Sequence, residues 1–496
     1  MASESYAKFI QKCEEDIRSG HLREVVARLR ELTPKRVPRD HRLALANLCR
    51  RVGLVQLGLA LLGPVVRPSN PRQSLTATPQ ELAEYAVLLH RDGVVYEPIE
   101  ILRQIDPAQA PEALLYQSFC WFNLWDYAKA VPLLERYVKS NISPYMELVG
   151  GVNLAAATIG AQEYDKAEII LSDLVGKTER SGLVRLQGNC LELLAQIRFY
   201  QTDFAGCKMY LQQAHSLLES SPTADVFFVK KWRRIVEALE NKDPAPLESL
   251  RIEAIARGEW ESVRVCDCYQ LKIRFDQEKF EHLLFGTPFP NYRNLLCREL
   301  GIDLYPREFL YGKGHERIFD FVNGEHRGVG AFLDSGKCVQ LVEVLLRDFY
   351  RPQRLGALFS DIYAGEYFDI VNSPNRMHQL FSRTRRLLEQ EALPIRILEK
   401  NGAYRLRIEG PVSFRLPLER KSIDTYHTEV ERLRRAFEGS ATFSASQARS
   451  VLNIPRTTFQ RIVNWAREQG TLTTVGKGSS TQYRFVPPKR ADSRAA

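Results

Sequence analysis

A recurring phrase in the first half of the chain constrains its fold most strongly. A polar or glycine turn, often followed by an aromatic residue, precedes a small or apolar residue that opens an amphipathic segment. The phrase occurs at 124–138, 161–175 and 201–215, with spacings of 37 and 40 residues when Ala130, Ala167 and Cys207 are aligned. Weaker copies occur at 20–32, 53–65, 93–105 and 258–270. Repetition every 31–42 residues, with two helices per unit, predicts a solenoid of helical hairpins.

Residues 1–285 are expected to be helical throughout, because apolar residues recur at three and four positions and no long alternating pattern interrupts them. The Tyr-x-Lys-Ala openings at 127–130 and 164–167 resemble tetratricopeptide (TPR) repeats, although the Trp-x2-Leu-Gly-x2-Tyr phrase of that family is missing. This resemblance implies a curved stack whose groove holds a protein or peptide partner. A packing or dimerisation scaffold without a ligand is the alternative.

The positive charge of the chain lies at its C-terminal end. Residues 371–496 carry 23 Lys and Arg against 11 Asp and Glu, a net charge of +12. Residues 1–370 carry 46 against 49, a net charge of −3, so the last quarter accounts for the total of +9. This charge distribution predicts that residues 371–496 bind a polyanion and that the near-neutral residues 1–370 have a different function.

A helix with a basic face is predicted at 373–391. Its apolar side contains Met377, Leu380 or Phe381, Thr384, Leu387 and Leu388. The opposite side carries Arg376, Gln379, Arg383 and Arg386. Such a stripe of guanidinium and amide groups suits a recognition helix, which binds base edges or phosphates. A solvated charged face is the alternative.

Two alternating strands around Glu-Lys-Asn-Gly are predicted at 395–408, with basic residues at Arg396, Lys400, Arg405 and Arg407. Two further helices are expected at 337–350 and 354–366, and a hairpin with an Asn-Gly turn is expected at 317–333. A small sheet, three helices and a terminal hairpin together make a winged helix.

The segment 315–410 resembles the OmpR-type effector domain of bacterial response regulators. Arg-Thr-Arg-Arg-Leu-Leu at 383–388 is similar to the end of that family's recognition helix, and Asn-Gly-Ala-Tyr-Arg-Leu at 401–406 is similar to its wing. The strands at 317–337 would match its N-terminal sheet. The wing has one glycine where the family has two, and no receiver domain precedes it, so phosphorelay control is not implied.

A second unit is expected at 425–488, with helices at 425–439, 441–453 and 454–470 and a hairpin at 471–486. The step from Ser446 to Arg461 resembles the helix-turn-helix of MarR- and DeoR-like winged helices. Phe459, Ile462, Val463 and Ala466 should face the core. The predicted DNA contacts are Arg456, Thr457, Thr458, Gln460 and Arg461, with Lys477 at the tip of the wing.

Other classes of protein find little support in the sequence. No apolar run is long enough to span a bilayer, and no phosphate-binding, metalloprotease or serine-hydrolase motif occurs. The nine cysteines include only one close pair, Cys266 and Cys268, whose spacing does not suit zinc. We therefore expect no enzyme activity, no metal site, no cofactor, no membrane span and reduced thiols in a cytoplasmic protein.

The sequence as a whole predicts a mainly α-helical protein with four parts: a TPR-like domain at 1–285, an OmpR-like winged helix at 290–412, a second winged helix at 425–488 and a disordered basic tail at 489–496. The predicted function is that of a bacterial transcriptional regulator that binds double-stranded DNA, at the nucleoid when bound, while its helical repeats sense or dock a partner or form a homodimer. A plasmid or phage replication initiator and a protein-interaction scaffold are the alternatives.

Overall fold

A computed structural model describes residues 3–486 except for 20, 69–74, 220–224, 331, 333–334, 371, 420–429, 431–432, 435, 438–441, 453–455, 469, 477 and 479–480. The chain divides into two compact units. The first comprises Met1–Leu358 and Phe368–Glu419, and the second comprises Phe359–Tyr367 and Arg420–Ala496.

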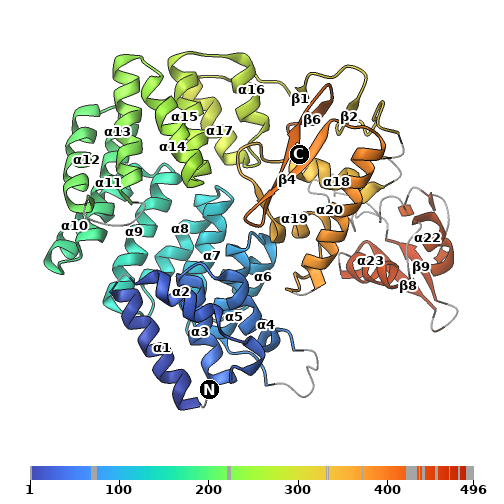
Figure 1. The fold of residues 1–496 in the computed structure, drawn as a ribbon, viewed down its shortest axis with the longest axis horizontal. Helices are drawn as coiled ribbons and strands as arrows, with labels where there is room; N and C mark the ends of the chain where they lie inside the picture. The colour runs from blue at the N-terminus through green and yellow to red at the C-terminus, as the bar shows by residue number, and fades with distance from the viewer. Residues whose placement is uncertain are drawn as a thin grey trace, which may run out of the picture. The chain divides into compact units, whose positions relative to one another are not determined.

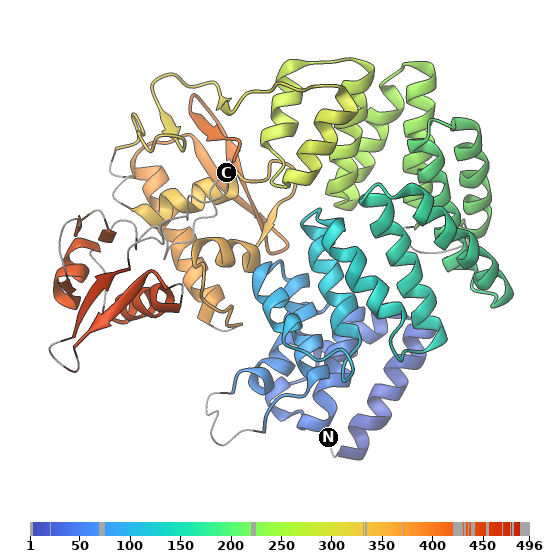
Figure 2. The ribbon, with the colours of Figure 1, turned by 180° about the vertical axis from the view of Figure 1, so that it is seen from behind.

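The first unit begins with a long series of helices that stack side by side along a curve (Figures 1 and 2). The series consists of α1 (Ser3–Arg18), α2 (Leu22–Arg30), the short 3-10 helix η1 (Pro34–Arg36), α3 (Arg39–Arg51), α4 (Val55–Val66), α5 (Pro79–Arg91), α6 (Tyr96–Arg103), α7 (Glu112–Asn123), α8 (Tyr127–Val138), α9 (Pro144–Gly160), α10 (Tyr164–Arg180), α11 (Val184–Tyr200), α12 (Phe204–Leu218), α13 (Asp225–Asn241), α14 (Ala245–Arg257), α15 (Trp260–Ile273), α16 (Gln277–Phe285) and α17 (Pro290–Leu300). Consecutive helices pair as hairpins, as the repeated phrase predicts.

The repeated sequence phrase forms a tight turn between the two helices of each pair. Trp125, Gln162 and Thr202 stand at the same place in three copies, and all three have positive φ values of 57°, 67° and 63°. A left-handed residue at this position reverses the chain within a few residues. The small residues Ala130, Ala167 and Cys207 then lie fully buried one turn into the second helix, where they allow close helix packing.

The first helices of several pairs are covered on all sides. In α11 every residue from Cys190 to Ala195 is buried, and in α15 the same holds from Cys266 to Leu271. Six consecutive residues of a helix point in all directions around its axis. Neither helix therefore offers an open face along this stretch, in contrast to the exposed concave groove that the TPR resemblance implies.

An α/β module, Glu308–Pro417, follows the helices and belongs to the first unit except for Phe359–Tyr367. It contains β1 (Glu308–Gly312), β2 (Ile318–Asp320), α18 (Gly336–Leu345), β3 (Gln353–Arg354), α19 (Leu355–Ile362), α20 (Asn372–Gln390), β4 (Ile395–Lys400), β5 (Ala403–Ile408) and β6 (Ser413–Pro417). One sheet has the strand order β3-β5-β4 and the other has the order β1-β6-β2. In the first of these sheets the short strand β3 lies beside β5, the second strand of the hairpin.

The hairpin β4–β5 follows its prediction closely. Lys400 pairs with Ala403, which leaves Asn401 and Gly402 as a two-residue turn with φ values of 55° and 72°. Positive φ at both positions is the mark of a type I′ turn. The buried face of the hairpin packs on α20, where the ring of Tyr404 stacks on Phe381 with 4.1 Å between centroids.

The prediction of a hairpin at 317–333 is wrong. β2 pairs in parallel with β6, and an isolated bridge between Ile318 and Arg327 is the only pairing with the segment after Asn-Gly in the described residues. The reason is local, because the carboxylate of Asp320 accepts hydrogen bonds from the backbone N–H groups of Val322 and Asn323. These bonds bend the chain directly after β2.

The last helical pairs are joined to the α/β module by a buried ion pair. Arg264 on α15 is fully buried, and its Nη2 donates to Oδ2 of Asp348, whose side chain is 6% exposed. The guanidinium also lies over the rings of Phe289 and Tyr350. Oδ1 of Asp348 accepts from the backbone N–H groups that follow it, so each polar atom of this carboxylate has a partner.

The turns of earlier repeats reach the same helices. Trp125 donates from Nε1 to Glu261 on α15 over 3.0 Å, and its carbonyl accepts from Nδ2 of Asn291 on α17 over 3.0 Å. Arg298 donates to Gln162 over 2.6 Å. Repeats that are far apart in the sequence are thus tied together.

The second unit is described mainly from residue 442 onward. It contains β7 (Phe443–Ser444), α22 (Ala445–Leu452), α23 (Arg456–Glu468), β8 (Leu472–Val475) and β9 (Gln482–Phe485), with the strand order β7-β9-β8. Phe459, Ile462, Val463 and Ala466 are buried together, as predicted. Most of the helix expected at 425–439 and the tail at 489–496 lie outside the described residues.

The predicted fold class is confirmed, because the chain is mainly helical, with paired helices followed by small three-stranded sheets. All nine cysteines are buried and unpaired. No helix of the described chain combines the length and apolar character needed to cross a membrane.

We predict that Arg264→Met lowers the free energy of unfolding of the first unit by about 3–5 kcal/mol, because it leaves the charge of Asp348 buried without its partner. Adding Asp348→Asn should restore part of this loss, since Asn retains the acceptor for the backbone N–H groups. Denaturant unfolding followed by circular dichroism measures both effects.

The matched control is Lys208→Met, which breaks an exposed pair with Glu240 and should cost less than about 1 kcal/mol. An Arg264→Met variant as stable as this control would contradict the prediction.

Candidate nucleic-acid interface

Helix α20 presents one polar stripe to solvent. Met377, Phe381, Thr384 and Leu388 are buried against the module. Gln379, Arg383 and Arg386, spaced at i, i+4 and i+7, are exposed on another side of the helix. None of these three forms an ion pair within the described part of the chain, so their donors remain accessible to an anion or a base edge.

Two other arginines of α20 differ from this stripe. Arg376, which was predicted as a contact, is half-buried and lies at the edge of the exposed face. Arg385 donates from Nη2 to the carbonyl of Ile397 over 3.1 Å and lies over the ring of Phe381. Arg385 therefore supports the packing of α20 on the hairpin.

The outer face of the hairpin is basic, but only part of it is uncompensated. Arg396, Lys400, Arg405 and Arg407 are all exposed and lie on the face that alternates with the buried one. Arg396 and Arg407 both pair with Glu409, and these two arginines together hold the pKa of its carboxyl below the ordinary value. Lys400 and Arg405, the two predicted contacts, form no ion pair in the described chain.

The start of α20 is fixed to the helical repeats. The backbone N–H of Phe368 donates to Oε2 of Glu97 on α6 over 2.9 Å, and Arg67 binds the other oxygen of the same carboxylate. Asp369 accepts from the N–H of Asn372 and so caps the helix. The stripe on α20 is thus held at its N-terminal end by the repeats.

A second buried carboxylate lies at the same junction. Asp92, after α5, accepts from Nε2 of Gln56 through Oδ1 over 2.6 Å, but its Oδ2 is buried without a hydrogen-bond partner. Burial raises the pKa of Asp92 to about 6. Gly356 of α19 lies so close that a Cβ there would be 2.9 Å from the Asp92 carbonyl oxygen, so only glycine fits without a shift.

The second unit has a similar stripe on α23. Arg456 and Gln460 are exposed, as predicted, and Gln460 donates to Oδ1 of Asn464 over 3.1 Å. The side chains of Thr457, Thr458 and Arg461, as well as all of Lys477, lie outside the described residues. Ser444 and Gln447 form a reciprocal capping box that fixes the start of α22.

Two further residues of α23 belong to this stripe and were not singled out from the sequence. Asn464 and Arg467 continue from Gln460 at steps of four and three, and both are exposed. They line a shallow cavity of about 590 Å³ beside β8. Extending the helical period by two more positions would have identified them.

Comparisons with known proteins concern the helical repeats. No protein-family model matches the chain, and no curated protein matches it. Among solved structures, a tetratricopeptide repeat protein from Parabacteroides merdae is 18% identical, with a TM-score of 0.34 over 57% of this chain and 98% of that one. The apo form of RapI is 12% identical, with a TM-score of 0.37 over 57% of this chain and 84% of that one.

A mutant of MamA is 16% identical, with a TM-score of 0.28 over 36% of this chain and 94% of that one. Likeness at this level extends to runs of paired helices and carries no information about partners. The repeat fold is established by the turns and small residues of the chain itself.

We predict that Asp92→Asn stabilises the first unit at pH 7 by about 1–2 kcal/mol relative to the wild type. The unfolded carboxyl ionises near pH 4, whereas the folded one retains its proton until about pH 6. The wild type should therefore lose stability relative to the variant as pH rises from about 4 to 6, and the difference should vanish below pH 4.

Denaturant titrations at several pH values measure this difference. The control is Asp303→Asn, an exposed carboxylate whose removal should give no such step. A difference between wild type and Asp92→Asn that stays constant from pH 4 to 7 would refute the prediction.

Proposed function

We propose that this protein is a non-enzymatic DNA-binding regulator, in which α20 and α23 act as recognition helices on duplex DNA. The observation that carries the proposal is the stripe of Gln379, Arg383 and Arg386 on a helix whose opposite side is buried. A helix of this kind fits the major groove, where arginine pairs with guanine and glutamine with adenine.

The second unit supports the same reading. It has the same order of two helices and a hairpin, the same strand order and a comparable stripe that begins at Arg456. Two basic modules in one chain could occupy two neighbouring half-sites. The charge of +12 on residues 371–496 favours a polyanion as their common ligand.

The helical repeats form the regulatory part of the proposal, which docks or senses a partner. Because the stretches 190–195 of α11 and 266–271 of α15 are buried throughout, a protein partner would use other surfaces. Exposed apolar side chains on the second helices of pairs, such as Ile169 at 73% and Met209 at 50%, are candidates for such contacts.

A protein-interaction scaffold, in which the basic modules also dock proteins, is the second candidate. The DNA-binding regulator and the scaffold differ in their response to salt. Neutralising DNA phosphates releases counterions, so binding to DNA weakens steeply as the salt concentration rises. A replication initiator would differ from a regulator in location. Genome-wide DNA immunoprecipitation would find it at one origin, whereas a regulator would be found at promoters.

We predict that Arg383→Ala weakens binding to the preferred site by about 1–3 kcal/mol and relaxes the preference for one base pair, because the guanidinium binds a base edge. Lys400→Ala and Arg405→Ala should weaken binding to all sequences alike and lower the salt slope by about one each. Arg461→Ala tests the second unit and should also cost about 1–3 kcal/mol.

Selection from a randomised duplex library with the full chain supplies the site, and fluorescence anisotropy at several salt concentrations supplies the affinities. The control is Arg180→Ala with Arg233→Ala, two exposed arginines of the helical repeats. If the selection enriches no sequence, or if the affinity for DNA does not change with salt concentration, the DNA proposal is eliminated. The protein-interaction scaffold then remains.

A further inference from the structure

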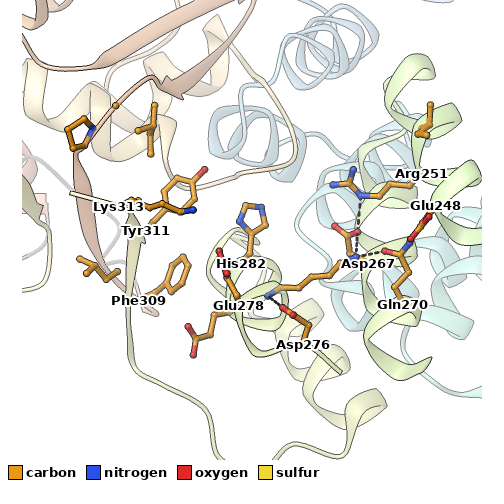
Figure 3. A pocket seen from close by; sticks show the side chains of 18 residues that line it. Glu248, Arg251, Asp267, Gln270, Asp276, Glu278, His282, Phe309, Tyr311 and Lys313 are labelled. Carbon is orange, nitrogen blue, oxygen red and sulfur yellow. Dashed lines mark hydrogen bonds and ion pairs between the residues drawn. The ribbon is translucent and has the colours of Figure 1, made fainter. Parts of the chain in front are cut away.

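A large pocket lies within the first unit between the last helical pairs and the α/β module. Its volume is about 1110 Å³, slightly above the roughly 300–1,000 Å³ that is typical of small-molecule sites. One wall is formed by α14, α15 and α16, and the other by β1 and the turn after β5. Figure 3 shows His282 between the two walls, with Phe309, Tyr311 and Lys313 on one side and Asp267 and Arg251 on the other.

Two cations share one carboxylate at the floor of the pocket. Asp267 is 2% exposed and accepts from Nε of Arg251 over 2.8 Å and from the hydroxyl of Tyr350 over 2.8 Å. Nζ of Lys279 lies 3.3 Å from the same carboxylate and also donates to Gln270. Both cations at the floor therefore pair with Asp267, which leaves this group of three with a net charge of +1.

The charges that remain around the pocket are mostly negative. Four carboxylates line it without an ion-pair partner in the described chain, namely Glu248, Asp276, Glu278 and Glu281. Lys313 is the one cation of the lining that has no ion-pair partner in the described chain. Glu278 and Glu281 are three residues apart on α16 and so project from neighbouring positions on one side of the helix.

Aromatic and aliphatic surface completes the lining. Phe309 and Tyr311 alternate with Leu310 along β1, and their rings are held by stacking on Phe285 and Phe349. Leu310 is 49% exposed, and Ile252 on the opposite wall is 70% exposed. Aromatic faces attract cations, and the aliphatic side chains suit a methylene chain.

We propose that this pocket binds an alkylammonium chain, a flexible aliphatic stem that carries at least two ammonium groups. The ammonium groups pair with Glu278, Glu281 and Glu248, while the stem lies along Phe309 and Ile252. A free polyamine and the lysine side chains of a peptide share this chemistry. The inference goes beyond DNA binding and does not depend on it.

Isothermal titration calorimetry of the full chain, without DNA, tests the proposal with two probes, spermidine and a capped tripeptide of lysine. Saturable binding of at least one probe is expected, and the tighter one identifies the source of the ammonium groups. Glu278→Gln and Glu281→Gln should each raise the Kd by about three- to fivefold. Lys313→Gln should lower it, because it removes the opposing charge.

The matched control is Glu31→Gln, an exposed carboxylate of the helical repeats, which should leave the Kd unchanged. An equal concentration of magnesium chloride as competitor should displace little of either probe. The absence of saturable binding by both probes would overturn the proposal. Binding that Glu31→Gln weakens as much as Glu278→Gln would also overturn it, because the affinity would then reflect general surface charge.

Discussion

The buried pair of Arg264 and Asp348 is the contact on which the first unit depends. A guanidinium without solvent exposure must have its charge compensated within the protein, and the sequence supplies the carboxylate 84 residues later. One turn further along α15, Asp267 receives the hydroxyl of Tyr350. The same short segment after α18 thus provides partners for two buried charges on α15, which explains why the helical repeats and the α/β module form one compact unit.

A second set of contacts joins the α/β module to the early helical repeats. Glu97 binds the backbone just before α20, and Asp92 lies against Gly356. The helix that carries the proposed DNA stripe is therefore attached to early repeats, while the strand β1 faces late repeats across the pocket. Any change in the curvature of the stack would strain one of these attachments, which gives the repeats a mechanical route to α20.

Local features of the fold were predictable from the sequence because they depend on neighbouring residues. The small residues Ala130 and Ala167 marked the second helices, and Asn401-Gly402 determined a two-residue turn. The exposed positions of Arg383 and Arg386 followed from the helical period. Contacts made in space were not predictable: β6 was missed because its partners are β1 and β2, about 95 to 109 residues away. For the same reason the sequence could not show that a pocket lies beside β1.

The hydrogen bond from Phe368 to Glu97 spans 271 residues and has a consequence for biosynthesis. Repeat proteins usually fold from neighbour to neighbour, so early repeats can mature while later ones are still being made. Here a contact of the early repeats forms only after a distant segment has been synthesised. The delay is on the order of tens of seconds at ordinary rates of translation. During that interval Oε2 of Glu97 lacks the N–H of Phe368, and Arg67 is the partner that the carboxylate already has.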